Sequence, residues 1–496
     1  MVSNFRSPAL AISLLLCLAV PFQLSAQQHK VRYKLIDLGT LGGPISYGSV
    51  NGDGFRLLND AGMIASYADL AVPDPNASFG CYDGDCFQAH AFQWKNGVII
   101  DLGALPENNN SAAGSINSRG WATGQSQSST LDPVLGFPEL RAVLWKHGQI
   151  IDLGTLGSGT ESLGIFVNDA GQVIGFSTIN TEPDPIGFFF QTHTFIWQNG
   201  EKLDIGTLGG NDTFPGASCS HPPEGMVWGQ SATSTIPNPD TGIPTLDPIL
   251  WDHGKMTDLG TLGGTFGFAQ CAISRHEVIG QSNLAGDATY HAFLWRNGKM
   301  NDLGTLGGDD SEAIWINEAG VIAGSADLPA PGIHDAVRWK GDQIQDLGTV
   351  DGDPCSRGRS INAKGQIVGG SSDCHNFLHA FVWEEGGPML DLNTLIPPGS
   401  GLQLTNAINI NDRGEILAKS DPLGVTPIDD EDLGHLVLLV PCDEGRGDCE
   451  NELAAGTSPV SFSDRTAVGQ QLNARKPIRA WRERFIGRVK IGAETQ

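Results

Sequence analysis

The chain has 496 residues, of which 40% are hydrophobic and 65 are glycine, roughly twice the usual glycine share of about 7%. Its 30 basic and 56 acidic side chains give a formal net charge of −26. The hydrophobic content is sufficient for a large folded core. The negative charge excludes nucleic acids as partners, and the chain as a whole would repel anionic lipid surfaces.

The first 26 residues have the pattern of a secretory signal peptide. Arg6 provides a positive charge, Leu10–Val20 is an apolar run, and Leu24-Ser25-Ala26 ends in small residues. This pattern predicts cleavage after Ala26 and a secreted or periplasmic mature protein. An uncleaved anchor is the alternative, but the run is short for a membrane span and no second long apolar run follows. We therefore expect no transmembrane segment.

A repeated motif organises residues 31–441. The string DLGTLGG begins at Asp37, Asp258 and Asp302, and near copies begin at Asp101, Asp152, Asp204, Asp346 and Asp391. These eight copies are about 44 to 64 residues apart, a period typical of propellers and related arrays.

We predict four short strands in each repeat unit. In the unit Asp258–Gly308, an alternating stretch ends near Glu277, a short apolar run ends at Ser282, and a third run is His291–Trp295. Alternation of apolar and polar residues predicts strands, and the glycines between them suit tight hairpins. These hairpin glycines explain most of the glycine excess. By analogy with WD-repeat propellers, we place DLGTLGG on the outermost strand of an antiparallel blade.

The two ends of the repeat region complete each other. The N-terminal part begins with a fourth strand, Tyr33–Gly43, whereas the last unit has strands near Leu404–Ile410, Glu415–Ser420 and His435–Val440 but no fourth strand. We therefore predict an all-β fold, a single closed β-propeller of eight four-stranded blades over residues 31–441. The N-terminal strand would complete the last blade and so remove an open sheet edge. An open solenoid is the alternative.

The sequence resembles the HAF-repeat family of extracellular repeat proteins. The resemblance rests on His90-Ala91-Phe92, His291-Ala292-Phe293 and His379-Ala380-Phe381, together with the DLGTLGG string and its near copies. It covers nearly all of residues 31–441, and residues 217–229 depart most from the pattern. The resemblance implies export and a repeat architecture, and it implies no activity.

Eight cysteines remain after the signal peptide, an even number that is typical of disulfides in an oxidising compartment. Their spacing favours the pairs Cys81–Cys86, Cys219–Cys271, Cys355–Cys374 and Cys442–Cys449, the local pairs most strongly. Zinc is the alternative use of cysteine, but no two cysteines have C-x₂-C spacing.

Residues 442–496 form a tail unlike the repeats. The segment Arg475–Lys490 has seven basic residues and one acidic residue, with Trp481, Phe485 and Val489 at roughly helical spacing. One expectation is a short basic helix that docks on the acidic disc or on an anionic envelope surface. The other is a partly disordered tail.

Candidate binding residues lie in loops. The connections between second and third strands vary in length and share one face with the blade crossovers, and such loops often carry binding sites. Acidic residues collect on this face, and the weak calcium candidates among them are Asp83, Asp85, Asp309, Asp310, Asp351 and Asp353. No calcium-loop motif is present, so solvated turn carboxylates are the alternative. We expect no other cofactor.

Two aromatic positions recur in the third strand. One holds the histidines His90, His193, His291, His379 and His435. The other holds the tryptophans Trp94, Trp145, Trp197, Trp251, Trp295, Trp339 and Trp383. We interpret the histidines as partners in a repeated hydrogen bond to the neighbouring strand, not as a metal ring. We interpret the tryptophans as packing between blades, not as a carbohydrate platform.

The sequence contains no nucleophile elbow, zinc-protease motif, dinucleotide fingerprint or phosphate-binding loop, so we assign no catalytic residue. We predict a secreted, non-enzymatic, monomeric propeller that binds a protein, an envelope polymer or a glycan through its loop-rich acidic face. The alternative is a secreted propeller hydrolase or lyase with carboxylate acid–base chemistry. A carboxylate pair clustered at the axial mouth would favour that enzyme.

Overall fold

The computed structural model describes residues 32–48, 55–79, 81–82, 86–105, 109–184, 190–217, 223–239, 241–341, 343–424, 434–442 and 449. The predicted signal peptide, Asp83, Asp85, Cys219 and the basic segment 475–490 lie outside these ranges. Within them, no helix has the length and apolar character needed to cross a membrane.

The described residues form short strands and one 3-10 helix. The strands of the first half are β1 (Arg32–Asp37), β2 (Gly42–Tyr47), β3 (Ile64–Pro73), β4 (Phe87–Lys95), β5 (Val98–Asp101), β6 (Ser111–Ile116), β7 (Ala122–Leu131), β8 (Pro138–Lys146), β9 (Gln149–Asp152), β10 (Ser162–Val167), β11 (Val173–Pro183), β12 (Phe190–Gln198), β13 (Glu201–Asp204), β14 (Thr213–Pro215), β15 (Met226–Ala232), β16 (Leu246–Asp252) and β17 (Lys255–Asp258).

The second half has the same alternation of longer and shorter strands. It comprises β18 (Gly263–Ser274), β19 (Glu277–Leu284), β20 (Tyr290–Arg296), β21 (Lys299–Asp302), β22 (Ser311–Ile316), β23 (Val321–Asp327), β24 (His334–Lys340), β25 (Gln343–Asp346), β26 (Cys355–Ile361), β27 (Ile367–Ser372), β28 (Phe377–Trp383), β29 (Leu390–Asp391), the helix η1 (Leu392–Thr394), β30 (Leu402–Ile410), β31 (Ile416–Pro422) and β32 (His435–Cys442).

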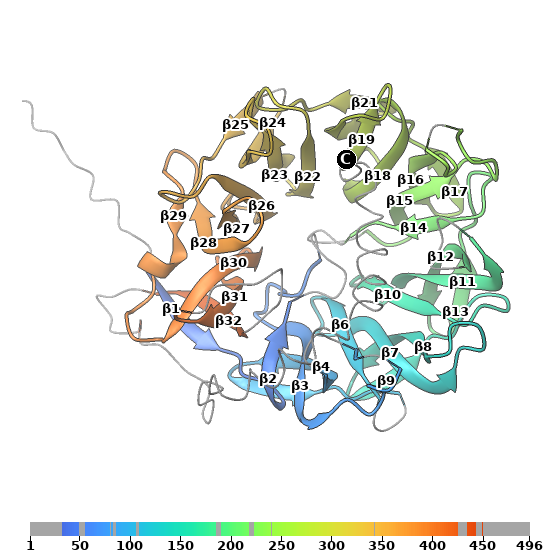
Figure 1. Cartoon of the computed structure of the whole chain (residues 1–496), viewed down its shortest axis with the longest axis horizontal. Helices are drawn as coiled ribbons and strands as arrows, with labels where there is room; N and C mark the ends of the chain where they lie inside the picture. The colour runs from blue at the N-terminus through green and yellow to red at the C-terminus, as the bar shows by residue number, and fades with distance from the viewer. Residues whose placement is uncertain are drawn as a thin grey trace, which may run out of the picture.

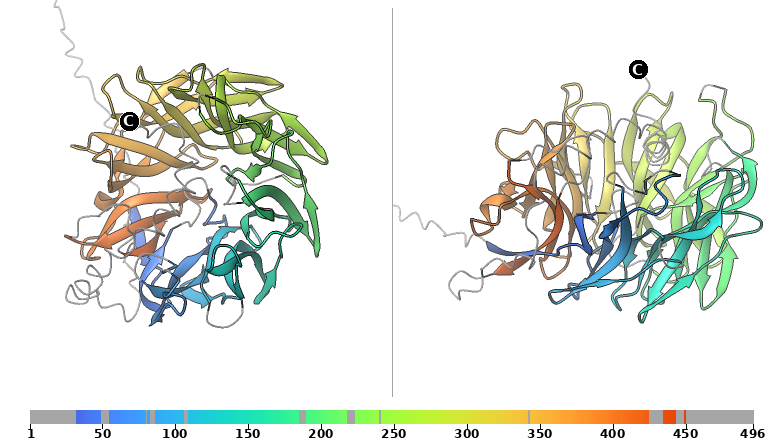
Figure 2. Two further views of the ribbon diagram at one scale, coloured as in Figure 1. Left: turned by 45° about the vertical axis from the view of Figure 1, so that its right-hand side comes forward. Right: turned by 60° about the horizontal axis from the view of Figure 1, so that its bottom comes forward.

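Consecutive strands form antiparallel four-stranded sheets, for example β2-β3-β4-β5 and β22-β23-β24-β25. The strands β14–β17 and β18–β21 are two further sets, joined into one sheet by a single parallel pair, Leu246 with Phe266. Figure 1 shows the sheets around a common centre, and the turned views in Figure 2 show them side by side along the circumference. This all-β arrangement is a β-propeller, the fold class that the repeats predict.

The N-terminal strand completes the sheet formed by the last three strands. β1 pairs with β32, from Arg32 opposite Cys442 to Asp37 opposite Val437. The predicted exchange of a strand between the chain ends is confirmed, although β1 ends at Asp37 and not near Gly43. The strand ends there because Asp37 Oδ1 accepts the Gly39 N–H at 2.9 Å, and Gly39 turns the chain with a φ of +72°.

The DLGTLGG string forms the crossover from one sheet to the next. In the copy after β17, Asp258 Oδ1 accepts the Gly260 N–H at 2.8 Å, and the Leu262 N–H donates to Ser282 Oγ of the following sheet at 2.9 Å. The same leucine-position bond to a second-strand serine joins Leu105 to Ser126, Leu156 to Ser177, Leu208 to Ser231 and Val350 to Ser371. The repeated motif therefore has a structural role at each junction.

A hydroxyl at the start of the first strand also joins neighbouring sheets. Ser162 Oγ in β10 accepts the Ala142 N–H of β8 at 3.0 Å and donates to Gly154 O at 2.7 Å. Equivalent acceptors receive N–H groups in the pairs Ser46 with Leu436, Ser111 with Ala91, Thr213 with Thr194, Ser311 with Ala292 and Ser356 with Ala336. The pair of Ser46 and Leu436 connects the first and last sheets.

At the junction between β16 and β18, both the hydroxyl and the N–H that it would accept are missing. Gly267 occupies the serine position in β18, and the facing third-strand residue is Pro248, which has no N–H to donate. A Cβ on Gly267 would lie 2.6 Å from Pro248 Cδ. The proline removes the need for an acceptor, and the glycine makes room for the proline ring.

Asparagines after the first strands form a second connection between sheets. Asn317 Nδ2 donates to Asn362 O at 2.9 Å, and Asn362 Nδ2 donates to Asn411 O at 3.1 Å. The series continues from Asn411 to Asn59, from Asn59 to Asn117 and from Asn117 to Asn168, at 3.1, 2.8 and 3.0 Å. It therefore also passes from the last sheet to the first.

The core lies between adjacent sheets. All seven third-strand tryptophans are buried, and Trp339 Nε1 donates to Leu303 O of the preceding crossover at 3.0 Å. Phe166 and Trp228, from successive sheets, stack with ring centroids 5.2 Å apart. The prediction that the tryptophans pack between blades is confirmed.

The junction hydroxyl leads to a first test. Ser162→Ala should lower the free energy of unfolding by about 1–3 kcal/mol, because the Ala142 N–H would remain buried without an acceptor. Urea unfolding followed by tryptophan fluorescence measures the change. The exposed Ser129 provides a control, and Ser129→Ala should leave the midpoint unchanged. An unchanged midpoint in Ser162→Ala would contradict the role of the hydroxyl.

Candidate functional site

The strand ends form two faces of the propeller. Turns between first and second strands and hairpins between third and fourth strands lie on one face, the turn face. Loops between second and third strands and the crossovers lie on the other, the loop face, because neighbouring strands are antiparallel. Asn76 in the β3–β4 loop donates to Asn109 in the next crossover at 3.2 Å and to Gln127 at 2.8 Å. Loops and crossovers of adjacent sheets are thus in contact.

Lysines and arginines are concentrated on the turn face, whereas carboxylates lie on both faces. The cations at strand ends gather on the turn face, at Lys95, Lys146, Lys255, Lys299, Lys340, Lys364, Arg119, Arg275, Arg296 and Arg413. Exposed and half-buried carboxylates gather on the loop face, at Glu182, Asp184, Asp287, Asp309, Asp310, Asp327, Asp351, Asp353 and Asp373. Two arginines near the loop face are paired, Arg141 with Glu139 at 2.9 Å and Arg357 with Glu312. The loop face is therefore strongly acidic.

The described calcium candidates lie in separate settings on this face. Asp310 Oδ1 accepts the Tyr290 N–H at 2.8 Å, and the Asp310 N–H donates to Asp327 Oδ2 at 3.3 Å. Asp353 Oδ2 is 2.8 Å from His379 Nδ1. Within the described ranges, no three His, Cys, Asp or Glu residues are grouped in a way that would hold a metal ion. Calcium binding stays a prediction.

The recurring histidines bind aspartates of the DLGTLGG strings. His193 Nδ1 lies 2.8 Å from Asp204. The pairs His90–Asp101, His291–Asp302 and His435–Asp37 have the same geometry, at 3.0, 2.8 and 3.0 Å. His379 differs and binds Asp353, and the aspartate of the last motif copy, Asp391, accepts the Asn393 N–H at the start of η1. The predicted hydrogen bond to the neighbouring strand is confirmed in four sheets.

Two sheets have an aspartate in the histidine position. Asp247 of β16 faces Asp258, and Asp335 of β24 faces Asp346. Burial and the facing carboxylate raise the pKa of Asp247 to about 6 and the pKa of Asp335 to about 7. Asp247 Oδ1 and Asp335 Oδ1 are buried without a hydrogen-bond donor. Sequence reasoning missed these pairs, although alignment of the repeats at the histidine position would have found them.

Two more carboxyl pairs lie beneath the loop face, at junctions between sheets. Glu161 is fully buried, and burial followed by the charges of Asp132 and Glu139 raises its pKa to about 8. Asp212 is also fully buried, and burial followed by the charge of Asp184 raises its pKa to about 8. Both side chains accept a backbone N–H, from Leu140 at 2.6 Å and from Thr192 at 2.8 Å. The shifted carboxyls are therefore part of the core.

A pocket on the turn face lies among the ends of the inner strands. Its lining includes Arg56, Asp60, Trp315 and Asp412. Arg56 is buried, with Nη2 2.6 Å from Asp60 Oδ2, and the charges of Asp169 and Asp412 also act on it. These carboxylates therefore surround and neutralise a buried guanidinium.

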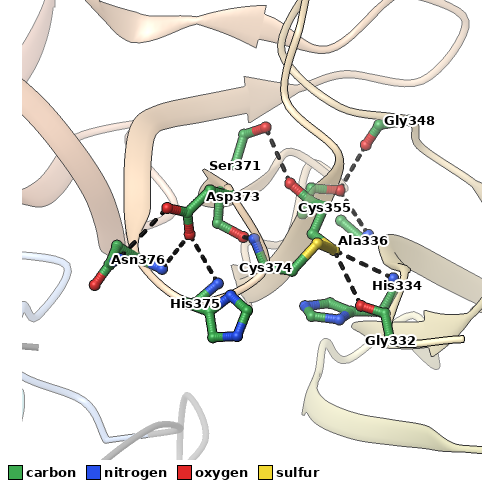
Figure 3. The surroundings of a disulfide bond; sticks show 12 residues. Gly332, His334, Ala336, Gly348, Cys355, Ser371, Asp373, Cys374, His375 and Asn376 are labelled. Atoms are coloured by element: carbon green, nitrogen blue, oxygen red, sulfur yellow. Dashed lines mark hydrogen bonds between the residues drawn. A yellow bond between two sulfur atoms is a disulfide. The ribbon is translucent and has the colours of Figure 1, made fainter. Parts of the chain in front are cut away.

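Disulfides brace the ends of the strands. Cys355, at the start of β26, is bonded to Cys374 in the β27–β28 loop, and Asp373 Oδ1 there accepts the N–H groups of His375 and Asn376 (Figure 3). The predicted bonds Cys81–Cys86 and Cys442–Cys449 are also present. Three predicted disulfides are thus confirmed. Cys271 is disulfide-bonded as well, and its predicted partner Cys219 lies outside the described residues.

Comparison with known proteins gives no sequence relative. No family model matches the chain, and no curated protein matches it, so membership of the HAF-repeat family stays a prediction. Among solved structures, the chain is similar to the β-propeller domain of the Trilobed protease from Pyrococcus furiosus, with 9% identity over 73% of this chain and 98% of that chain and a TM-score of 0.38.

Two peptidase structures are similar to the same extent. One is Porphyromonas gingivalis dipeptidyl peptidase 4, with 9% identity over 76% of this chain and 58% of that chain and a TM-score of 0.43. The other is the Pyrococcus horikoshii acylaminoacyl peptidase, with 12% identity over 70% of this chain and 52% of that chain and a TM-score of 0.37. The chain spans little more than half the length of these two peptidases.

The histidine–aspartate pairs predict acid sensitivity. Burial raises the pKa of Asp204, but hydrogen bonds from His193 and the Gly206 N–H and the charge of His193 outweigh it and lower the pKa below its usual value. The stability that Asp204 contributes is therefore present above the unfolded-state pKa of about 4 and is lost as the pH falls through the lower folded pKa. Asp204→Asn should be less stable than wild type at pH 7, with a flatter stability profile between pH 5 and pH 2.

The control is Asp351→Asn, because Asp351 is exposed on the loop face. Urea midpoints measured across that pH range should be the same in this control and in wild type. Equal profiles for Asp204→Asn and wild type would refute the stabilising pair.

Proposed function

We propose that the protein is an exported, non-enzymatic binding or scaffold protein whose loop face recognises a cationic partner. The partner would be a basic protein segment or an amine-bearing envelope polymer or glycan, because a surface of carboxylates attracts such groups and repels anionic ones. The scaffold would be a closed ring of eight blades, and export would follow cleavage of the signal peptide after Ala26.

Three contacts between the ends of the chain support a closed ring. β1 lies in the last sheet, the Leu436 N–H donates to Ser46 Oγ at 2.9 Å, and Asn411 Nδ2 donates to Asn59 O at 3.1 Å. Buried side chains of the first and last sheets also share one apolar cluster. A ring without a free edge would present the loop face as a rigid surface.

The placement of the cations is the observation that carries the binding proposal. The cations of the strand ends gather on the turn face, while carboxylates exposed in the loops face solvent opposite them. A uniformly solubilising surface charge would need no such separation. A docking surface for a cation, in contrast, requires carboxylates that are not neutralised by neighbouring lysines.

The burial of the most strongly shifted carboxyls favours binding over hydrolysis. A glycosidase-type mechanism needs two carboxyl groups that contact the substrate. Glu161 and Asp212 have no exposed surface, and Asp335 is 7% exposed. At the turn-face pocket, Asp60 is paired with Arg56. The three disulfides are compatible with a secreted or periplasmic protein, since such bonds persist in oxidising compartments.

Removing charge from the loop face should abolish capture of a cationic probe. In the variant Glu182→Gln/Asp309→Asn/Asp351→Asn, binding of the mature protein to immobilised oligolysine and to deacetylated amino-sugar oligomers should fall at least tenfold. The matched control, Glu201→Gln/Glu224→Gln/Glu318→Gln, removes the same charge from exposed positions on the turn face. It should bind within twofold of wild type in surface plasmon resonance at low salt.

Two outcomes of this experiment would contradict the proposal. Equal losses in both triple variants would show that net charge alone, and not the loop face, controls binding. Absence of binding by wild type to both cationic probes, with the fold intact by circular dichroism, would exclude a cationic partner. Release of shortened oligomers, detected by mass spectrometry, would instead favour the hydrolase.

A further inference from the structure

Four junctions between sheets share a side-chain acceptor directly before the junction hydroxyl. This acceptor receives an N–H from the third strand of the preceding sheet. The acceptor pairs are Asn110 with Ala89, Glu161 with Leu140, Asp212 with Thr192 and Asp310 with Tyr290, at 2.8, 2.6, 2.8 and 2.8 Å. Asn110, Glu161 and Asp212 also face the residue that follows the second strand of the preceding sheet, and this second contact differs from junction to junction.

At the first of these junctions the acceptor is an amide, and its bonds are complete. Asn110 Oδ1 accepts the Ala89 N–H, and Asn110 Nδ2 donates to Asp74 Oδ1 at 2.9 Å and to Gln127 Oε1 at 2.8 Å. Asp74 directly follows β3. An amide beside a carboxylate therefore satisfies this junction at any pH at which the aspartate is ionised.

At the next junction the acceptor is a carboxyl group. Glu161 replaces the asparagine, and Asp132, which directly follows β7, occupies the place of Asp74. Both are fully buried or nearly so, at 0% and 1% exposure. Glu161 Oε1 and Asp132 Oδ2 have no hydrogen-bond donor, although these two side chains lie within hydrogen-bonding reach of each other. The other charged groups facing them are Glu139 and its partner Arg141.

The following junction repeats this arrangement. Asp212 is fully buried and faces Asp184, which directly follows β11. Asp212 Oδ2 has no donor, and Asp184 Oδ2 accepts the Asn211 amide at 3.0 Å. Two adjacent junctions therefore place a carboxyl against a carboxyl where the preceding junction has an amide against a carboxyl.

A proton between the two carboxyl groups satisfies this geometry. Two ionised carboxylates in contact would repel each other, and the buried oxygens Glu161 Oε1, Asp132 Oδ2 and Asp212 Oδ2 have no hydrogen-bond donor. A calcium ion needs six to eight oxygen ligands, and each of these pairs offers far fewer. One proton converts one carboxyl into a donor, which reproduces the bond that Asn110 makes to Asp74.

We propose that one proton shared by Glu161 and Asp132, and a second shared by Asp212 and Asp184, fasten the junctions on either side of the sheet β10–β13. These protons make the loop face pH-responsive. The face is held together at mildly acidic and neutral pH, and its junctions loosen when alkaline solution removes the protons to water. The inference rests on the junction geometry and is independent of the proposed binding function.

The direction of the pH dependence follows from the shifted carboxyls. Burial raises the pKa of Glu161 and of Asp212 to about 8 in the folded state, far above the unfolded values near 4. The stability held by each proton is fully present below about pH 4 and is lost progressively as the pH rises to about 8. Over that interval the folding equilibrium constant should fall up to about tenfold per pH unit for each shared proton.

The double variant Glu161→Gln/Asp212→Asn tests the proposal. Each substitution places an amide where Asn110 has one, so the new side chain donates to the facing aspartate without a proton. Urea unfolding of the mature protein between pH 5 and pH 9 should show that the free energy of unfolding of wild type falls as the pH rises. In the variant the slope of this fall should be smaller by the equivalent of about two protons. Hydrogen exchange by mass spectrometry, corrected for intrinsic rates, should show the Leu140 and Thr192 amides losing protection above pH 8 only in wild type.

The variant Asn110→Asp is the converse test in an otherwise unchanged chain. It creates a carboxyl pair with Asp74. The slope of the free energy of unfolding against pH should therefore increase by the equivalent of about one proton. The Ala89 amide should also lose protection from hydrogen exchange above neutral pH. This variant keeps the proposal testable if the double variant fails to fold.

Three results would overturn the proposal. The first is a wild-type stability that does not change between pH 5 and pH 9. The second is a double variant with the wild-type slope. The third is full recovery of wild-type stability at pH 8 in millimolar calcium, reversed by chelator, because a cation and not a proton would then occupy the pairs.

Discussion

Short fourth strands leave backbone N–H groups unpaired, and the rest of the structure depends on how these groups are satisfied. β5 has four residues and pairs only with Phe92–Lys95 of β4, so the first half of β4 has no strand on its outer side. A buried backbone N–H without an acceptor is costly, and an exposed one invites pairing with another chain. In this protein the next sheet supplies the acceptors through side chains, Asn110 for Ala89 and Ser111 for Ala91.

This solution explains why so many polar side chains are buried at the junctions. Serine hydroxyls, asparagine amides and carboxyl oxygens replace the carbonyl groups of a missing strand, so they must lie within the core. The junction of Gly267 with Pro248 also supports this explanation. Pro248 has no N–H to donate, and Gly267, at the position of the junction hydroxyl, has no hydroxyl to accept one. The polar residues that recur at the junctions are therefore explained by the backbone N–H groups at the sheet edge, and they need no shared chemical activity.

The sequence predicts most of the fold because the relevant signals are local and periodic. Alternation and hairpin glycines are sufficient to predict the strands, and the missing strands at each end are sufficient to predict the pairing of β1 with β32. The histidine bond and three disulfides also follow from spacing. The carboxyl pairs do not, since Glu161 and Asp132 are 29 positions apart and meet only through the contact between two sheets. For the same reason, the asparagine series between the sheets could not be predicted.

The same requirement connects the junctions to the loop face. An acceptor at a junction can be an amide, a disulfide sulfur or a carboxyl. At Cys355, the sulfur accepts the backbone N–H of His334 at 3.5 Å. A carboxyl acceptor beside another carboxyl adds a titratable site without adding surface charge while the proton is held. Loss of that proton makes the loop face more negative, which strengthens its long-range attraction for a cation, but it also loosens the loops that present the exposed carboxylates. Proton release therefore has two opposing effects on the loop face: it adds negative charge, and it removes order. A binding face built this way stays ordered only while its buried carboxyl pairs keep their protons.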